Sequence, residues 1–210
     1  MSSRGAQAEN RIFGLTACAL SGMKSLGKSV LFLGIAGLLL LLVWSMLRKL
    51  TEAPGQPSVT GAFGGGLMYT LGVTGVFGML NQALPLYQLL GPRYYALRGA
   101  EQISWLYRVL RVEWLRRFLC WVHYHRPQPR RTFFGGRRAD LPELLKNIQG
   151  AECTHLLALL AMLALPPYFL YLGRYDLAAG AAVGNFFGNF YPIVLQRHHR
   201  GRLLRLHSSL

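Results

Sequence analysis

Two ionisable residues, Glu152 and His155, are the first candidates for chemistry in this sequence. They lie three positions apart in the stretch A-E-C-T-H-L-L, and this spacing places both side chains on one face of a helix. A histidine can take a proton from a hydroxyl group while a carboxylate orients its ring, so the pair predicts general acid–base catalysis. The alternative is a helix start at headgroup depth, where Glu152 interacts favourably with the helix dipole and His155 forms a local hydrogen bond.

A second set of polar residues lies near the C-terminus, where an apolar stretch with two asparagines is followed by a run of arginine and histidine. Asn185 and Asn189, four positions apart, predict either a hydrogen bond between helices or a polar pocket for a substrate carbonyl or hydroxyl. The arginine run is typical of a flank that binds anionic lipids, although Arg197 also suits a phosphate or carboxylate. The candidate substrate-binding residues are Asn185, Asn189, Gln196, Arg197, Arg200 and Arg202.

The sequence indicates no metal and no cofactor. Cys120, His123 and His125 match no strong zinc pattern, although a zinc site shared with His198 and His199 is an alternative. The three cysteines of the chain have no paired spacing, so we expect free thiols. The sequence contains no glycine-rich phosphate loop, no G-x-S-x-G and no H-E-x-x-H motif.

The elements that must position these residues are predicted to be membrane helices. Of the 210 residues, 52% are hydrophobic, yet the formal net charge is +15 and the charges lie between apolar blocks. We therefore expect an all-α polytopic membrane protein with about four spans, at residues 30–47, 61–80, 156–172 and 177–195. The predicted division is an N-terminal leader, span and loop at residues 1–60, then a membrane domain at 61–210 with an interfacial section at 91–150, a span hairpin at 154–195 and a basic tail at 196–210.

The central polar section contains a predicted helix over residues 101–121, with arginines on one side and tryptophans and leucines on the other. Such a helix is typical of the membrane interface. Its two polar stripes do not line up, so we expect a kink or two short helices near Val112. Pro166 and Pro167 interrupt the third predicted span, and a four-residue turn at residues 173–176 joins it to the fourth.

The distribution of basic residues predicts the orientation. The leader has four, the first loop two, the central section twelve, the last turn one and the tail four. By the positive-inside rule, both termini lie on the cytoplasmic or matrix side, in a plasma membrane or a mitochondrial inner membrane. The leader weakly resembles a mitochondrial presequence. Because the basic residues follow membrane flanks, we expect anionic lipids as partners and no nucleic acid.

Four motifs in this order resemble the glycosyl-diaponeurosporenoate acyltransferase family, which is linked to acylating the sugar of staphyloxanthin-type carotenoids. They are L-Y-R-x-L-x-V at residues 106–112, F-G-G at 134–136, A-E-x-x-H at 151–155 and N-x-x-P-I-x-x-Q-R-x-x-R-x-R-L at 189–203. The resemblance covers residues 67–206. The chain departs from the family pattern at Leu156, His198, His199 and Gly201, and residues 1–60 have no counterpart in shorter relatives.

The resemblance implies an O-acyltransferase that moves a fatty acyl group to a lipid-linked sugar or a similar hydroxyl. His155 would be the general base, oriented by Glu152, and Asn189 or Gln196 would stabilise the oxyanion. The basic tail would hold a phosphorylated or CoA-like acyl donor. Two alternatives remain open: a non-catalytic accessory subunit of a large energy-transducing membrane complex, such as a respiratory complex or ATP synthase, and a lipid- or carotenoid-binding scaffold.

Overall fold

The computed structural model describes residues 3–52, 58–96, 100–124 and 141–208, and within these ranges all regular elements are helices. The predicted all-α fold is therefore confirmed. The helices, in chain order, are α1 (Ser3–Glu52), α2 (Val59–Ala83), η1 (Leu86–Leu90), α3 (Gly91–Tyr95), α4 (Ala100–Val109), α5 (Glu113–Tyr124), α7 (Leu141–Met162), α8 (Leu165–Tyr171), α9 (Tyr175–Asn185), η3 (Phe186–Phe190) and α10 (Tyr191–Ser208).

Three helical segments of the described chain are long and apolar enough to cross a membrane. They are Leu26–Glu52 in α1, Val59–Ala83, which is α2, and Leu141–Tyr171, which combines α7 and α8. The third begins earlier than predicted, because the expected lead-in helix and the span form one continuous helix, α7. The break falls after Met162, just before Pro166 and Pro167, which lack the backbone N–H that a continuous helix would use.

The fourth predicted span, residues 177–195, is also helical, but it is not among the three segments that meet the length and hydropathy criteria. It comprises most of α9, all of η3 and the start of α10, which follow one another without a loop. The expected turn before it is present: α8 ends at Tyr171, Gly173 has a φ of 69°, and α9 starts at Tyr175. Whether this helix crosses the bilayer stays a prediction.

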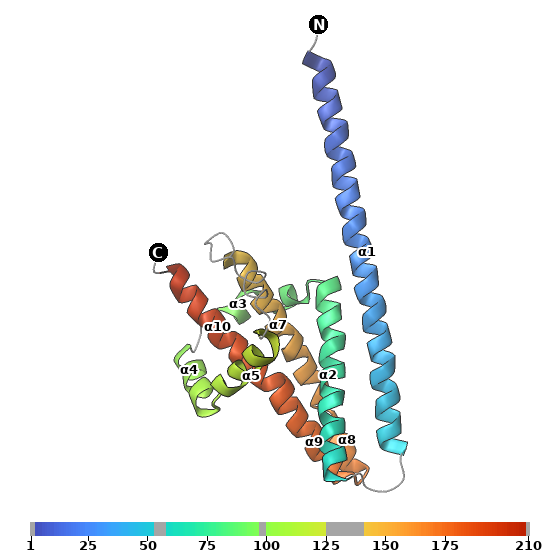
Figure 1. Ribbon diagram of the computed structural model, residues 1–210, viewed down its shortest axis with the longest axis vertical. Coiled ribbons are helices and arrows are strands. Elements are labelled where there is room, and N and C mark those ends of the chain that lie inside the picture. The colour runs from blue at the N-terminus through green and yellow to red at the C-terminus, as the bar shows by residue number, and fades with distance from the viewer. Residues whose placement is uncertain (1–2, 53–57, 97–99, 125–140, 209–210) are drawn as a thin grey trace.

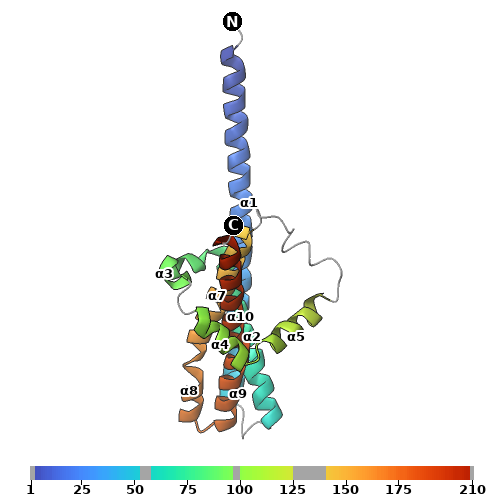
Figure 2. The same ribbon diagram turned by 90° about the vertical axis from the view of Figure 1, so that its left-hand side faces the viewer.

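Glycines bring α2 and α9 into backbone contact. A Cβ on Gly66 would overlap the backbone of Gly180, and a Cβ on Gly184 would lie 2.7 Å from Oγ1 of Thr70. Such close approach of small residues is how membrane helices associate without a hydrophobic driving force. As a result α2 lies between α1 and α9 (Figures 1 and 2), and Asn189, which follows α9, accepts a hydrogen bond from Thr74 of α2.

The antiparallel pair of α7 and α10 carries most of the other predicted site residues: Glu152 and His155 on α7, and Gln196, Arg197, Arg200 and Arg202 on α10. The N-terminal end of α7 and the C-terminal end of α10 lie on the same side of the molecule (Figure 1). Pro85 and the short helices η1 and α3 follow α2 and bring Tyr94 and Tyr95 against this pair.

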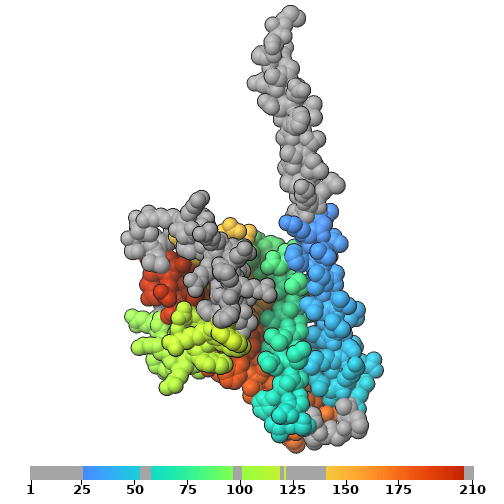
Figure 3. Space-filling view, in the orientation of Figure 1, coloured from blue at the N-terminus to red at the C-terminus, as the bar shows by residue number. Residues whose placement is uncertain are grey.

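The predicted kink near Val112 is confirmed. Helix α4 ends at Val109, α5 starts at Glu113, and Arg111 between them has a φ of 49°. Val112 is fully buried against residues of α10, and the Tyr191 hydroxyl donates to the Leu110 carbonyl at 2.8 Å. Figure 3 shows α4 and the described part of α5 on the outside of the helix bundle. The large aromatic side chains of this section are exposed: Trp105, Trp114, Phe118 and Trp121.

Candidate functional site

A carboxylate held by two arginines forms the centre of the α7–α10 contact. Glu152 is fully buried, and its Oε1 accepts from Nε of Arg197 at 2.7 Å. Its Oε2 accepts from Nε of Arg200 at 3.1 Å, and Nη2 of Arg200 lies 3.4 Å from Oε1. One negative and two positive charges leave this cluster with a net charge of +1. Because a buried charge without a partner is costly, Glu152 fixes both guanidinium groups in place.

The two arginines differ in their access to solvent. The side chain of Arg200 is 5% exposed, and its Nη1 donates to the backbone carbonyl of Tyr95. The side chain of Arg197 is 32% exposed, and its Nη2 donates to the Tyr94 hydroxyl oxygen at 2.6 Å. Burial raises the pKa of Tyr94, so this phenol keeps its proton. Arg197 is therefore the member of the cluster that a bound molecule could reach.

His155 belongs to a separate polar cluster with the two asparagines. Its Nδ1 lies 3.3 Å from Oδ1 of Asn189, while Nδ2 of Asn189 donates to Oδ1 of Asn185 at 2.9 Å. Nδ2 of Asn185 in turn donates to the Leu159 carbonyl at 3.1 Å. This chain of bonds assigns each amide orientation and makes His155 Nδ1 the donor. In the neutral ring Nε2 then carries the lone pair, as a general base requires.

Helix α2 closes this cluster from the other side. Oγ1 of Thr74 lies 2.8 Å from Oδ1 of Asn189 and also 2.8 Å from the Thr70 carbonyl, so one hydroxyl proton serves two acceptors. Asn189 is fully buried and belongs to η3, which is a π-helical turn. Single π-helical turns inside α-helices occur frequently at functional sites.

The structure brings together most of the predicted residues, but in two groups. One contains His155 with Asn185 and Asn189, and the other contains Glu152 with Arg197 and Arg200. Glu152 was predicted to orient His155, but in the described part of the chain its two carboxylate oxygens bond to Arg197 and Arg200 instead.

The other predicted residues lie at the edges of these groups. Gln196 is half-buried on α10, and Arg202 lies further along the same helix and is exposed. The ring of His198 stacks on Tyr107 with centroids 4.0 Å apart. The side chains of the remaining residues of the alternative zinc site, Cys120, His123 and His125, lie outside the described part of the chain.

Three residues of the site, Thr74, Tyr94 and Tyr95, were not predicted from the sequence. Thr74 shares a helix face with Thr70, and this spacing was the available signal for it. Tyr94 and Tyr95 gave no local signal, since their partners lie more than 100 residues away on α10.

Comparison with known proteins identifies the segment that carries these residues. The sequence model of the glycosyl-4,4'-diaponeurosporenoate acyltransferase family matches residues 91–209, more than half of the chain. This segment includes both clusters except for Thr74. No curated protein and no solved structure matches the chain. The chain belongs to the glycosyl-4,4'-diaponeurosporenoate acyltransferase family.

Proposed function

We propose that this chain is an integral membrane O-acyltransferase, which transfers a fatty acyl group to a hydroxyl of a lipid-linked sugar or a similar acceptor. The family match supports acyl transfer in general. The observation that carries the proposal is the contact of His155 Nδ1 with Oδ1 of the buried Asn189, because it makes Nε2 the basic nitrogen of the neutral ring. Glu152 lies about one helical turn before His155 on α7, and it is held there by two arginines of α10.

In the proposed reaction, Nε2 of His155 accepts the proton of the acceptor hydroxyl as the hydroxyl oxygen attacks the acyl carbonyl carbon. The carbonyl π electrons move to oxygen and give a tetrahedral oxyanion. When this intermediate collapses, the bond to the donor's leaving group breaks, and the protonated imidazole returns its proton to that group. The new ester and the protonated leaving group account for all atoms and charges.

The oxyanion requires a donor that is still available. Asn189 is poorly suited, because its Nδ2 already donates to Asn185 and it is fully buried. We assign it instead as a positioning residue for His155. The partly exposed guanidinium of Arg197, with Gln196 beside it, is the better candidate. Glu152 acts through the two arginines that it holds, which replaces its expected role in orienting His155.

The basic end of α10 suits the acyl donor and the membrane surface. Arg202 and Arg205 are exposed there, which fits a phosphorylated or CoA-like donor or anionic lipid headgroups. With both termini on the positive side, this end faces the cytoplasm or the matrix, in a plasma membrane or a mitochondrial inner membrane.

The test is acyl transfer by membranes that contain the chain, with a radiolabelled fatty acyl-CoA and a glycosylated lipid as substrates. The variant His155→Ala should lower the transfer rate at least about 100-fold, the lower end of what a general base contributes. His199→Ala is the matched control, because burial lowers the pKa of His199 and its removal takes away no charge near neutral pH. Unchanged transfer by His155→Ala would overturn the assignment.

A second candidate, an accessory subunit of a larger membrane complex, is favoured by α1. This helix precedes the family-matched segment and leaves large apolar side chains exposed along its span, among them Leu31, Leu41 and Trp44. Either lipid or another subunit could cover them. Native electrophoresis of the chain from its own membrane discriminates the two, since a subunit migrates with its complex and a solitary enzyme does not.

A further inference from the structure

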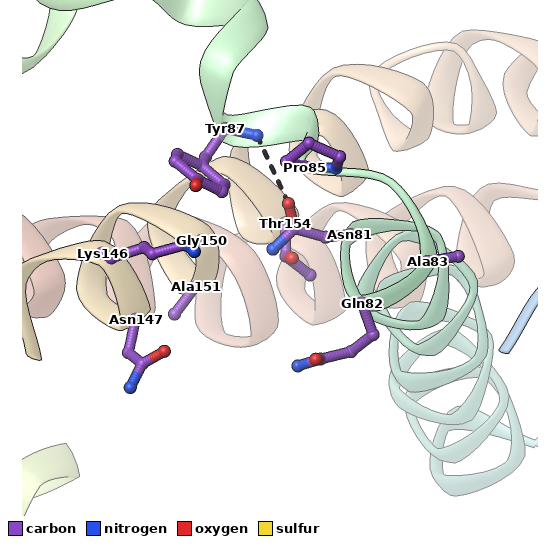
Figure 4. A pocket seen from close by; sticks show the side chains of 11 residues that line it. Asn81, Gln82, Ala83, Pro85, Tyr87, Lys146, Asn147, Gly150, Ala151 and Thr154 are labelled. Carbon is purple, nitrogen blue, oxygen red and sulfur yellow. Dashed lines mark hydrogen bonds between the residues drawn. The ribbon is translucent and has the colours of Figure 1, made fainter. Parts of the chain in front are cut away.

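A cavity of about 540 Å³ lies where α2, η1 and α7 meet, at the end of α2 that precedes η1 (Figure 4). Most of its lining is polar or small, and the lining contains no aspartate or glutamate. The lining residues are Gly78, Asn81, Gln82, Ala83, Pro85, Tyr87, Lys146, Asn147, Gly150, Ala151 and Thr154.

The wall of the cavity is set by Asn81 and Gly150. Oδ1 of Asn81 accepts from the backbone N–H of Tyr87 at 3.3 Å, which ties η1 to the end of α2. A Cβ on Gly150 would lie 2.8 Å from Nδ2 of Asn81, so a larger residue there would displace this carboxamide from its present position against α7. The hydrogen bond and this close contact together define the position of the amide at the cavity wall.

Two further carboxamides are free to recognise a ligand. Gln82 on α2 and Asn147 on α7 extend toward the same side of the cavity from opposite walls (Figure 4). Neither has a hydrogen-bonding partner in the described part of the chain, and each offers both a donor and an acceptor. Lys146 adds one positive charge, with its Nζ 5.9 Å from the centre of the Tyr87 ring.

The cavity lies one helical turn from the His155 cluster. Ala151 lines the cavity and precedes His155 by four positions on α7, while Gly78 lines it and follows Thr74 by four positions on α2. Four residues of helix rise about 6 Å. Since α2 and α7 run in opposite directions, both steps lead the same way, to the place where His155 and Thr74 meet Asn189.

We propose that this cavity binds the neutral, polyhydroxylated headgroup of the acyl acceptor and places one of its hydroxyls toward His155. The role of the headgroup as acyl acceptor rests on the proposed acyl transfer, whereas the binding of the headgroup in the cavity does not. Carboxamides pair well with hydroxyl groups, because each can donate and accept at once. A phosphate headgroup would favour several charged donors, whereas this lining offers one lysine, and the guanidinium groups of Arg197 and Arg200 are bound to Glu152 elsewhere.

The experiment measures equilibrium binding of tritiated octyl glucoside, below its micelle concentration, to the chain in lipid nanodiscs. Octyl phosphate, with the same alkyl chain, is the comparison ligand. We expect the wild type to bind the glucoside at least tenfold more tightly than the phosphate. The variants Gln82→Leu and Asn147→Leu should each weaken glucoside binding about three- to tenfold, as expected for the loss of a hydrogen bond.

A cavity-filling variant and its control test the location. Ala151→Leu places three extra carbons in the cavity and should abolish glucoside binding, while Ala161→Leu on the exposed side of the same helix should leave it unchanged. Equal binding of glucoside and phosphate overturns the proposal. The proposal is also overturned if the Gln82→Leu and Asn147→Leu variants bind glucoside as tightly as the wild type. It is overturned as well if Ala151→Leu and Ala161→Leu weaken glucoside binding equally.

The two proposals fail in different ways. His155→Ala should abolish acyl transfer and keep glucoside binding. If the wild type binds glucoside in this pattern but transfers no acyl group, the cavity assignment stands and the proposed function falls. If transfer occurs and Ala151→Leu leaves its rate unchanged, the cavity assignment falls and the proposed function stands.

Discussion

Replacing Glu152 by glutamine should destabilise the packing of α7 against α10. The substitution Glu152→Gln keeps the size of the side chain but removes the negative charge that pairs with Arg197 and Arg200. Arg200, at 5% exposure, would then be a buried cation without a counter-charge. Removing one partner of a buried ion pair costs about 3–5 kcal/mol. The folding equilibrium constant should therefore fall by about two to nearly four powers of ten.

A second substitution separates charge from packing. In the double variant Glu152→Gln/Arg200→Met the unpaired buried cation is gone, and methionine fills a similar volume. Arg197 remains, but at 32% exposure water can solvate it. Since apolar replacement of a buried ion pair is often close to neutral, the double variant should recover at least half of the lost stability.

Unfolding in detergent measures both effects. The purified chain is titrated with sodium dodecyl sulfate, and helix content and tryptophan fluorescence are followed together. Glu101→Gln on α4 is the control, because Glu101 is exposed and its removal should change the unfolding free energy by less than about 0.5 kcal/mol. A loss below about 1 kcal/mol in Glu152→Gln, or a double variant less stable than the single one, would refute the reasoning.

Two further predictions concern packing and pH. Gly180→Leu should cost at least about 1–3 kcal/mol in the same titration, because its side chain would meet the backbone of Ala62, while Gly37→Leu in open space should not. Hydrogen bonding to Arg116 lowers the pKa of Glu113 from its ordinary value of 4.5 to about 2. This interaction stabilises the fold above pH 4.5 and is lost as the pH falls toward 2, so Glu113→Gln should remove that part of the pH dependence. These predictions would be contradicted if Glu113→Gln kept the wild-type pH dependence of the unfolding free energy, or if Gly180→Leu and Gly37→Leu lowered the unfolding free energy equally.

Local sequence patterns predicted the helices and the kink near Val112, since apolar runs and polar stripes are properties of neighbouring residues. They did not predict the partner of Glu152. Its arginines lie 45 and 48 positions away, and the spacing to His155 pointed to a nearer group. The match of a carboxylate on α7 to guanidinium groups on α10 depends on how the two helices are rotated, which periodicity in either helix leaves undetermined.

Asparagine spacing was similarly informative only in part. Asn185 and Asn189 were predicted to form either a hydrogen bond between helices or a polar pocket, and both do bond to neighbouring helices, Asn185 to α7 and Asn189 to α2. The π-helical turn that starts after Asn185 and contains Asn189 was not predicted, because no residue type marks such a turn. Thr74 reaches Asn189 because α2 and α9 approach each other closely, which is also why Gly66 and Gly180 pack together.

The π-helical turn at Phe186–Phe190 also sets the rotation of α10 relative to α9 about the helix axis. Upstream of it, Gly180 must face α2, and downstream Arg197 and Arg200 must face Glu152 on α7. Each residue of an α-helix contributes about 100° of rotation, so one deletion here would swing both arginines about a quarter-turn away from their carboxylate. Substitutions within Phe186–Phe190 alter only local side-chain contacts. An insertion or deletion there would prevent the glycine contact of α9 with α2 and the ion pairs of α10 with Glu152 from forming at the same time.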